Sequence, residues 1–331
     1  MGSQFVDLNG DGHSDYVTSI FDGSPHVSWG SEAGFGEPEL LYDASKERIL
    51  VSYYWDYDEE SHLTTGRAMP DGEAANIRGI SALAFDWDGD GDFDLLQGTY
   101  EEGRLFLQLN EGTDAAPRFT GKNQAVLAGG VPLENKAKMT APRLVDWDGD
   151  GDQDLVYGTF GDAQTPGRIL LLVNTGKVGA PVFAAPRVLL EGVAPEGVPE
   201  ATGPSEGLYP EVVDWDGDGD LDLIVGGYSR WTPPGRELND EEQAKVLALR
   251  EELEVQQAAY QVVLEEYNAE LETLPEGLTG EQRRAASAAV YGRFKSRLSD
   301  ANGEVAAVRK QLEELVPAAK RKPFVWLYER L

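Results

Sequence analysis

The chain has 331 residues, of which 41% are hydrophobic and 9% aromatic, enough to bury a core in one large all-β domain or in two domains. Its formal net charge of -31, from 59 acidic and 28 basic residues, argues against nucleic acid or an anionic membrane surface as a partner. With no cysteine and three histidines, thiol chemistry and disulfides are excluded, and an imidazole metal cluster is disfavoured.

The start of the chain and its hydropathy bear on location. The opening segment MGSQFVDLNG has neither the basic nor the apolar region of a leader, and we interpret Met1 to Ser3 as replacing one. No stretch approaches the roughly 18 apolar residues that a membrane-spanning helix requires, so we expect no membrane insertion.

An acidic phrase recurs four times along the chain. The strong copies DWDGDGDFD, DWDGDGDQD and DWDGDGDLD begin at Asp86, Asp146 and Asp214, and a weaker copy, DLNGDGHSD, begins at Asp7. These starts are 79, 60 and 68 residues apart. Internal similarity at such spacings indicates a repeat architecture of sequential structural units.

Short apolar or alternating runs surround each acidic phrase. In the unit at Asp146 they read PRLVDWD, DLVYGTF, GRILLLVN and GAPVFAAPRVLL, bounded by Gly, Pro and Asn. Such runs are typical of strands, and four per unit match one blade of a β-propeller. We therefore predict a mainly β fold, a small propeller of four repeats over residues 4–236.

Residues 44–80 have no counterpart in the other units. We interpret this stretch as an insertion or as the remnant of a further blade. The predicted number of blades is therefore four, or five if this stretch contributes one.

From residue 237 to residue 317 the composition changes to Glu, Ala, Gln, Leu, Arg and Lys, and apolar residues recur at alternating steps of three and four. The two series are Val246, Leu249, Leu253, Tyr260, Val263, Tyr267 and Leu274, then Tyr291, Phe294, Leu298, Ala301, Val305, Val308, Leu312 and Leu315. This pattern predicts a long antiparallel helical hairpin whose apolar seams face each other. The helices are expected to start at Asn239 or Asp240 and at Thr279. Dimerisation or partner binding through the hairpin stays open.

The last unit is interrupted by this hairpin. It supplies PEVVDWD and DLIVGGYSRW, but a third strand is missing until PFVWLYERL, which is similar to GRLFLQLN and GRILLLVN. We therefore predict that residues 322–331 form the closing strand of the last blade, with the hairpin inserted between two of its strands.

The acidic phrases have the residues of a calcium-binding loop. In the copy at Asp86, carboxylates alternate along a tightly turned segment, Gly91 permits the turn, and position 7 usually lends its backbone carbonyl. Hard oxygen ligands that converge in this way favour Ca²⁺ over Mg²⁺, with Mn²⁺ left open. The loop at Asp7 has Asn9 in place of an aspartate and His13 at the carbonyl position, so we expect it to bind more weakly.

An EF-hand begins in the same way but requires a glutamate at position 12, followed by a helix. The twelfth positions here are Thr18, Gln97, Tyr157 and Val225, and the flanking segments are predicted strands. An EF-hand is therefore disfavoured.

The loop with its flanking strands resembles the FG-GAP or VCBS repeat, known from the propellers of integrin α-subunits and from many secreted bacterial proteins. The resemblance covers residues 5–235 and the closing strand, whereas the hairpin is foreign to the basic repeat. It implies a calcium-stabilised β-propeller with about one Ca²⁺ per loop, up to four. Carried over residue by residue, it implies metal ligands at Asp7, Asn9, Asp11, His13, Asp15, Asp86, Asp88, Asp90, Asp92, Asp94, Asp146, Asp148, Asp150, Asp152, Asp154, Asp214, Asp216, Asp218, Asp220 and Asp222.

Aromatic residues suggest two further features. Trp87, Trp147 and Trp215 share the second position of the strong loops, which favours packing between blades over a sugar-stacking platform. The connections between the second and third strands should cluster on one face, as a candidate contact surface or as ordinary turn packing. Their conspicuous residues are Tyr100, Phe160, Tyr228, Arg230 and Trp231.

The leading functional hypothesis is a calcium-stabilised, secreted binding or scaffold module for protein partners, with the hairpin as a contact arm. The alternative is a lectin-like propeller that binds cell-surface or extracellular polysaccharide. A polysaccharide-acting enzyme with paired carboxylates is disfavoured, because the conspicuous aspartates are assigned to metal loops and no catalytic triad or phosphate loop is visible. We expect no enzymatic activity. Since extracellular modules bind Ca²⁺ at about 10⁻⁴ to 10⁻³ M, we expect a secreted, periplasmic or cell-surface location.

Overall fold

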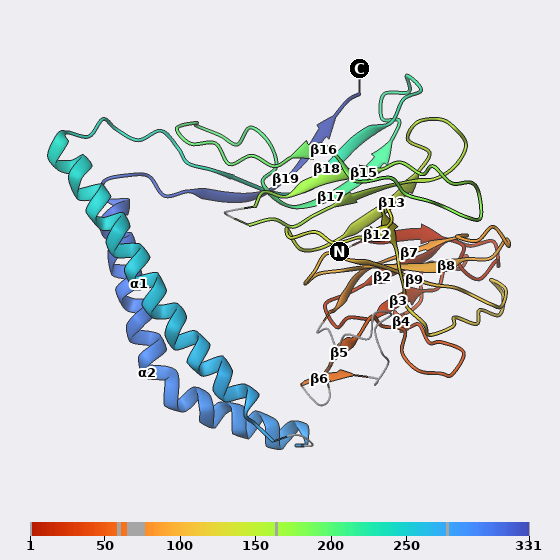
Figure 1. The fold of residues 1–331 in the computed structure, drawn as a ribbon, viewed down its shortest axis with the longest axis horizontal. Coiled ribbons are helices and arrows are strands. Elements are labelled where there is room, and N and C mark those ends of the chain that lie inside the picture. Colours follow the sequence, from red (N-terminus) through yellow and green to blue (C-terminus); the bar gives the residue numbers. More distant parts are fainter. Residues whose placement is uncertain (1, 58–60, 65–76, 163–164, 276–277, 331) are drawn as a thin grey trace.

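The structure, a computed structural model, describes residues 2–57, 61–64, 77–162, 165–275 and 278–330. Antiparallel β-sheets form the body of the protein, and a long two-helix hairpin projects from it (Figure 1). No helix in the described ranges combines the length and the hydropathy needed to cross a membrane.

Four of the sheets contain the acidic phrases, and we number them in chain order. Sheet 1 consists of β1 (Ser3–Val6), β2 (Asp15–Ser19), β3 (Pro25–Ser28) and β4 (Glu39–Leu40). Sheet 2 consists of β7 (Gly79–Phe85), β8 (Asp94–Thr99), β9 (Leu105–Gln108) and β10 (Gln124–Ala125). Sheet 3 consists of β13 (Ala141–Val145), β14 (Asp154–Gly158), β15 (Arg168–Leu172) and β16 (Arg187–Glu191). Sheet 4 consists of β17 (Glu206–Val213), β18 (Asp222–Trp231) and β19 (Lys320–Tyr328).

The sheets have one plan, as the repeat predicts. In each of them the first and second strands pair antiparallel, and the acidic phrase connects these two strands. In sheet 3, for example, Val145 pairs with Asp154 at the acidic end and Ala141 pairs with Gly158 at the other. The acidic loops and the connections between second and third strands therefore lie at opposite ends of each sheet.

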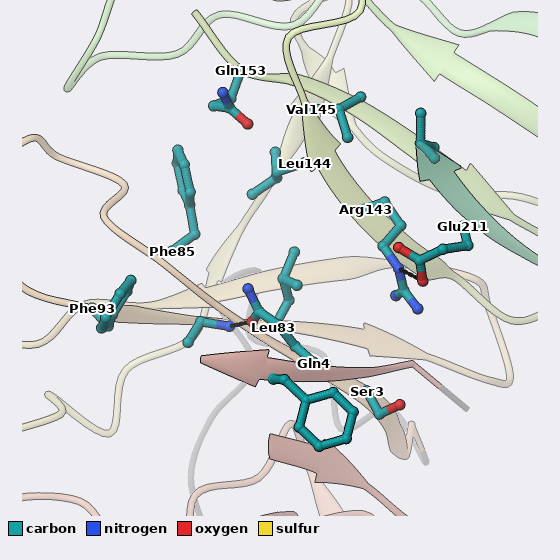
Figure 2. A pocket seen from close by; sticks show the side chains of 13 residues that line it. Ser3, Gln4, Leu83, Phe85, Phe93, Arg143, Leu144, Val145, Gln153 and Glu211 are labelled. Atoms are coloured by element: carbon teal, nitrogen blue, oxygen red, sulfur yellow. Dashed lines mark hydrogen bonds and ion pairs between the residues drawn. The ribbon is translucent and has the colours of Figure 1, made fainter. Parts of the chain in front are cut away.

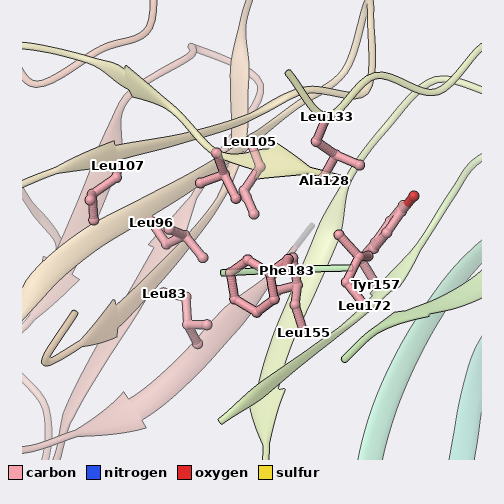
Figure 3. Close-up of a cluster of buried hydrophobic side chains, with 11 residues drawn as sticks. Leu83, Leu96, Leu105, Leu107, Ala128, Leu133, Leu155, Tyr157, Leu172 and Phe183 are labelled. Carbon is pink, nitrogen blue, oxygen red and sulfur yellow. The ribbon is translucent and has the colours of Figure 1, made fainter. Parts of the chain in front are cut away.

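Three apolar clusters join consecutive sheets. Val17 of β2 packs in one cluster with Ala84 of β7, which joins sheets 1 and 2. Leu83 of β7 and Leu155 of β14 belong to the cluster between sheets 2 and 3 (Figure 3). Sheets 3 and 4 are joined by the cluster that contains Leu171 and Val225. Full burial of a Val or Leu side chain stabilises a fold by about 1.5 to 3 kcal/mol. Each sheet is therefore held against the next one in the chain by its apolar cluster.

Residues 44–80 contribute a small sheet of two strands, β5 (Tyr53–Asp56) and β6 (Ser61–Thr64). The amide N–H of Trp55 donates to the carbonyl oxygen of Asp22, 2.7 Å away, which attaches β5 to the turn between β2 and β3. Residues 58–60 and 65–76 lie outside the described residues, so a fifth blade in this stretch stays a prediction. A second small sheet pairs β11 (Leu127–Ala128) with β12 (Val131–Pro132).

The predicted helical hairpin is confirmed as α1 (Asp240–Glu272) and α2 (Gly280–Glu313). Both helices begin with a capping box, formed by Asn239 with Glu242 in α1 and by Thr279 with Gln282 in α2, because each cap side chain accepts an otherwise unpaired N–H. At about 1.5 Å per residue, each helix is about 50 Å long.

The seam of the hairpin holds the two helices together. Val246 and Leu249 of α1 pack against Val308 and Leu312 of α2. Further along the hairpin, the ring of Tyr267 lies edge-on to Phe294, 5.7 Å between centroids. Ion pairs flank the seam, with Glu266 bound to Arg297 and Glu270 to Arg293. The two predicted seams therefore face each other, although Tyr291 of the second seam remains 48% exposed.

The C-terminal strand β19 pairs antiparallel with β18, from Leu223 opposite Tyr328 to Trp231 opposite Lys320. The chain thus leaves sheet 4 after β18, forms both helices and returns as the third strand of the same sheet. The expected pairing of the C-terminal segment is confirmed, and the strand starts at Lys320 because the register continues to the end of β18.

The three loop tryptophans do not all have the same environment. Trp87 lies 5.9 Å from Phe183 of the neighbouring unit, and Trp147 packs in the cluster between sheets 3 and 4. The prediction of packing between units holds for these two. Trp215 is 60% exposed, which contradicts the prediction for the third. The reason is that no sheet follows sheet 4 in the described chain.

Candidate metal centres

The acidic loops are tight turns that require glycine. In the loop at Asp86, Gly89 and Gly91 have φ values of 78° and 97°, which residues with a Cβ rarely adopt. The corresponding glycines of the other two strong loops have nearly the same values. Two residues with positive φ within six positions make this segment a tight turn. In such a turn alternate side chains point toward one centre.

Three carboxylates converge in each strong loop. In the first of them, Asp86, Asp88 and Asp90 each offer one oxygen, and these oxygens lie within 4.8 Å of one another. The same holds for the loops of sheets 3 and 4, with Asp146, Asp148 and Asp150 and with Asp214, Asp216 and Asp218. A Ca²⁺ ion takes oxygen ligands at about 2.3 to 2.6 Å, so one ion can contact three oxygens at this separation. The predicted ligands at positions 1, 3 and 5 are thus brought together.

Backbone N–H groups of the loop orient these carboxylates. Asp86 accepts from the amides of Gly89 at 2.8 Å and Gly91 at 3.2 Å, and Asp90 accepts from the amide of Asp92 at 3.1 Å. The loops of sheets 3 and 4 repeat these bonds. A charged carboxylate held in this way is directed into the turn before any ion binds.

The loop of sheet 1 differs in charge. Asp7 accepts from the amide of Gly12, as the first aspartate does from the equivalent glycine in the strong loops, but its second donor is the amide of Asp11 and not that of Gly10. Asn9, which carries no charge where the strong loops have an aspartate, donates its Nδ2 to Asp11 Oδ2 at 3.2 Å and so occupies one carboxylate oxygen. The backbone amide of His13 donates to Asp11. Weaker binding at this loop, and the ligand role of His13, stay predictions.

The seventh residues of the strong loops carry an unusual feature. The Oδ1 atoms of Asp92, Asp152 and Asp220 are buried and have no hydrogen-bond partner in the described part of the chain. Asp92 as a whole is only 8% exposed. A buried carboxylate oxygen without a partner is costly. A cation in the loop would offset this cost, and the fit recurs in all three strong loops.

The ninth residues have a different role from the one expected. Asp94 accepts the amide of Trp87 at 2.9 Å with one oxygen and that of Asn110 at 2.7 Å with the other. The equivalent carboxylates of Asp15, Asp154 and Asp222 accept the same kind of pair, one amide from the loop and one from beyond the third strand. These aspartates tie each loop to its sheet, and their role as metal ligands stays a prediction.

Sequence reasoning missed residues that support the loops. Asn110 Oδ1 accepts the amides of Gly112 and Arg118, and Asn174 Oδ1 accepts the equivalent pair in sheet 3. The signal is present in the sequence as the repeated pattern N-x-G followed by A-P-x-F. Asp114 was also missed. Its Oδ1 accepts the amide of Phe93 at 2.7 Å, beside the loop of sheet 2.

Crowding raises the pKa of several loop carboxyls. Burial, followed by repulsion from Asp90 and Asp114, raises the pKa of Asp92 to about 6. Burial also raises the pKa of Asp94 to about 6, against the opposing effect of its two backbone hydrogen bonds. The pKa values of Asp152, Asp154 and Asp220 are raised, in each case mainly by burial.

These shifts predict an inverted pH dependence for the metal-free protein. Because the pKa of Asp92 and Asp94 is about 6 in the fold and near 4 in the unfolded chain, the fold binds more protons between these values. We expect the thermal midpoint of calcium-free protein to rise as the pH is lowered from 7.5 to 5.5. The corresponding gain in the free energy of unfolding is on the order of 1 kcal/mol per carboxyl. In saturating Ca²⁺ the midpoint should instead fall, because protons compete with the ion. Thermal unfolding at both pH values checks this, and Asp92→Asn should reduce the change.

The candidate contact surface lies at the other end of the sheets. Tyr100 and Phe160 stack edge to face at 5.9 Å, and both Phe160 and Tyr228 reach within 3.6 Å of where a Cβ of Gly207 would lie. Phe21, which occupies the same position in the first repeat and was not predicted, contacts Tyr100 at 6.2 Å and is 51% exposed. The structure therefore places one aromatic residue from each repeat in a continuous row.

Arg230 and Trp231 do not extend this row as an open surface. Arg230 forms an ion pair with the buried Glu206 at 3.2 Å. Trp231 is only 5% exposed, and its Nε1 donates to the carbonyl oxygen of Pro199. For Trp231 this burial fits the ordinary turn packing that the sequence left open, because the segment before β17 binds the indole nitrogen and Phe324 packs against the ring.

A cavity of about 590 Å³ lies where the first strands of the four sheets approach one another (Figure 2). β1, β7, β13 and β17 line it. Gln4 Oε1 accepts the amide of Ala84 at 2.8 Å, and Arg143 is paired with Glu211 at 3.0 Å. Among the lining residues, the two charged groups are therefore already paired with each other, and Gln4 is engaged by the backbone of β7.

Comparison with known proteins identifies the repeats. A family model described as FG-GAP-like repeat matches residues 86–157 and 146–225, so each match runs from one acidic loop into the next unit. A search of curated proteins found no match. The matched stretch contains the strong loops of sheets 2, 3 and 4, whose carboxylates converge. The chain therefore carries FG-GAP-like repeats.

Proposed function

We propose that this protein is a calcium-stabilised binding or scaffold module of the β-propeller type, without enzymatic activity, that takes protein partners and uses its hairpin as a contact arm. The observation that carries the calcium part is the recurrence, in three consecutive sheets, of converging carboxylates beside a buried carboxylate oxygen without a partner. Ca²⁺ supplies positive charge at these centres, and the chain supplies the oxygens.

Contacts between units support a structural role for the ion. A Cβ on Gly179 would lie 2.4 Å from the carbonyl oxygen of Asp88, so the connection after β15 of sheet 3 touches the acidic loop of sheet 2. Asp114 of sheet 2 approaches Gly10 in the loop of sheet 1 in the same way. An ion that orders one loop therefore also orders its contact with the neighbouring sheet.

The hairpin supports the idea of a contact arm. It projects from the sheets (Figure 1), and its seam is closed by its own two helices. Exposed apolar residues remain on the outside of α1, where Leu247, Val255 and Val262 are 62%, 64% and 53% exposed. A partner, or a second copy of the chain, could cover such residues, and dimerisation through the hairpin remains part of the proposal.

The proposed calcium sites also bear on where the protein is located. Extracellular modules bind Ca²⁺ at about 10⁻⁴ to 10⁻³ M, and such sites are filled outside the cytosol. We therefore propose a secreted, periplasmic or cell-surface location.

A second candidate function is carbohydrate binding. The row of Phe21, Tyr100, Phe160 and Tyr228 favours it, since one exposed and three half-buried rings lie beside cationic groups. The guanidinium of Arg78 lies 5.7 Å from the ring of Phe21 and 5.8 Å from that of Tyr100. A glycan array with calcium-loaded protein separates the two candidates, because only the carbohydrate function requires a specific signal.

Calcium titration calorimetry tests the proposed metal centres. Asp90→Ala, Asp150→Ala and Asp218→Ala should each remove one strong binding event, because each change deletes one of three converging carboxylates. Asn9→Ala is the matched control in the loop of sheet 1, and it should leave all three strong events. Wild-type protein that takes up no calcium would reject the proposal, and so would variants with unchanged stoichiometry.

A further inference from the structure

Cationic side chains lie against the aromatic rings at the end of the sheets opposite the acidic loops. The rings, which we call the aromatic row, are those of Phe21, Tyr100, Phe160 and Tyr228. Arg78 lies near the first two rings, at 5.7 and 5.8 Å from their centroids. The ammonium group of Lys138 is 6.0 Å from the ring centroid of Tyr100, and the guanidinium of Arg321 is 3.5 Å from that of Tyr228. The row therefore has positive charge along its length.

Carboxylates neutralise only part of this charge. Glu101 binds Arg78 at 2.7 Å, and Glu206 is shared by two arginines, Arg230 and Arg321. Lys138 is exposed and forms no ion pair with any residue of the described ranges. An anion at the row thus meets the free ammonium group of Lys138 and one more guanidinium than Glu206 can neutralise.

The backbone beside the row is strained. Lys138 and Met139 have φ values of 58° and 59°, a region that residues with a Cβ rarely adopt. The amide of Met139 donates to the carbonyl oxygen of Tyr100 at 2.7 Å, and the amide of Phe160 donates to that of Lys138 at 3.0 Å, so the row itself fixes this conformation. Strain of this kind clusters at sites that hold ligands. Since glycine at position 138 would relieve it, the exposed lysine side chain is present at a cost in stability.

Much of the negative charge of the chain lies away from the row. The acidic loops are at the other end of the sheets, as the register of β13 with β14 shows. β14 has five residues and spans roughly 16 Å at about 3.3 Å per residue. Charges at physiological ionic strength are screened over about 8 Å, so the loops repel an anion at the row only weakly.

We propose that the aromatic row binds an acidic oligosaccharide, whose carboxylate or sulfate groups pair with Lys138 and Arg321 and whose sugar rings stack on the aromatic rings. The C–H groups of a sugar ring carry weak positive charge, which the negative face of an aromatic ring attracts. The anionic groups form charge-assisted hydrogen bonds with the lysine and the arginine. The inference rests on the second candidate of the proposed function, since it names the chemical class of the carbohydrate.

Titration calorimetry with calcium-loaded, full-length protein tests the ligand class. The probes are short dextran sulfate oligosaccharides, for the sulfate group, and hyaluronan oligosaccharides, for the carboxylate. We expect a dissociation constant on the order of 10 to 100 µM for at least one of them, weakened by salt. Unsulfated dextran of the same length is the matched control for charge, and oligoglutamate of the same charge is the control for the sugar. Each control should bind at least about ten times more weakly, and equal affinity for either one overturns the proposal.

Variants of two lysines separate ligand binding from strain. Lys138→Gly should raise the thermal midpoint by a few degrees, because glycine adopts this φ freely, and should weaken the acidic oligosaccharide at least about tenfold. Lys46 is the matched site, since it is exposed and has a φ of 62°, but among the described residues it lies against none of the four rings. Lys46→Gly should raise the midpoint by a similar amount and leave the affinity unchanged.

A charge reversal covers the case in which Lys138→Gly does not fold. Lys138→Glu keeps the strained backbone, so it should abolish binding without raising the midpoint. Unchanged affinity in the variants of Lys138 overturns the proposal. Equal loss of affinity in Lys46→Gly also overturns it, because binding would then reflect general attraction of a polyanion.

The remaining measurements distinguish this inference from the proposed function. The calcium dependence of the thermal midpoint is measured on the same samples. An intact calcium effect without binding of either acidic probe rejects the acidic ligand alone. Specific binding of neutral glycans keeps the carbohydrate candidate and rejects the acidic ligand. Loss of the calcium effect rejects the proposed function.

Discussion

Calcium is expected to raise the midpoint of thermal unfolding by at least about 10 °C relative to the same protein in EGTA. Each strong loop gathers five aspartates in nine residues, and three of their carboxylates lie within 4.8 Å of one another. Without an ion these groups repel, and the buried oxygen of Asp92 and its equivalents has no partner. An ion at about ten times its dissociation constant stabilises the fold by about 1.4 kcal/mol per site, so three sites give about 4 kcal/mol.

Differential scanning calorimetry in millimolar Ca²⁺ and in EGTA measures this shift. Sodium chloride at equal ionic strength is the control for screening, because a nonspecific salt effect would be similar for both cations. Asp90→Ala should reduce the shift by roughly one third, in line with the loss of one of three sites. Coincident curves in calcium and EGTA would contradict the proposed metal centres.

Removal of β19 is expected to abolish soluble, cooperatively folded protein. A chain that ends at Ala319 loses the ladder from Leu223 to Trp231 and exposes the length of β18 as a new edge. It also loses Tyr328, which packs against the core between sheets 3 and 4, and Phe324, which covers Trp231. The combined loss is on the order of 5 kcal/mol or more, which matches the total stability of many domains. Expression, solubility and thermal unfolding of the shortened chain measure the effect.

The matched control deletes far more of the chain and should do far less harm. Because Trp231 and Lys320 are register partners, the two ends of the hairpin insertion lie side by side. A short Gly/Ser linker in place of residues 234–318 should therefore leave a folded, calcium-binding body with a midpoint within a few degrees of the full chain. Wild-type behaviour of the protein that ends at Ala319 would refute the role of β19, and collapse of the linker variant would show that the hairpin is part of the core.

Much of the local structure could be predicted from the sequence. The alternation of aspartate with glycine in DWDGDGD determines both the turn and the ligand type, because few residues other than glycine adopt the φ values found at Gly89 and Gly91. Apolar residues that recur every three or four positions predict the hairpin, and Asn239 and Thr279 mark the starts of its helices. The similarity of PFVWLYERL to earlier third strands identified the pairing partner of β18 across the whole insertion.

The roles within each loop could not be predicted, because they depend on where other strands end. Asp94 and Asp90 are both loop aspartates in the sequence, yet the amide of Asn110 reaches only Asp94. In sheet 4 the amide of Arg330 makes the equivalent bond to Asp222, from 108 residues away. A repeated pattern specifies the residue type at each position, whereas the third strand decides which carboxylate is already engaged.

The sequence by itself thus determined the repeats, the oxygen-rich loops and the helical insertion, since each depends on residues close together in the chain. Only the tertiary structure decided which groups are covered. Trp87 and Trp215 occupy the same loop position, but the first packs on Phe183 of the next unit and the second is 60% exposed. Whether a side chain is buried depends on the sheet that packs against it. The local sequence pattern is the same in every repeat, so it does not show which neighbour a given sheet has.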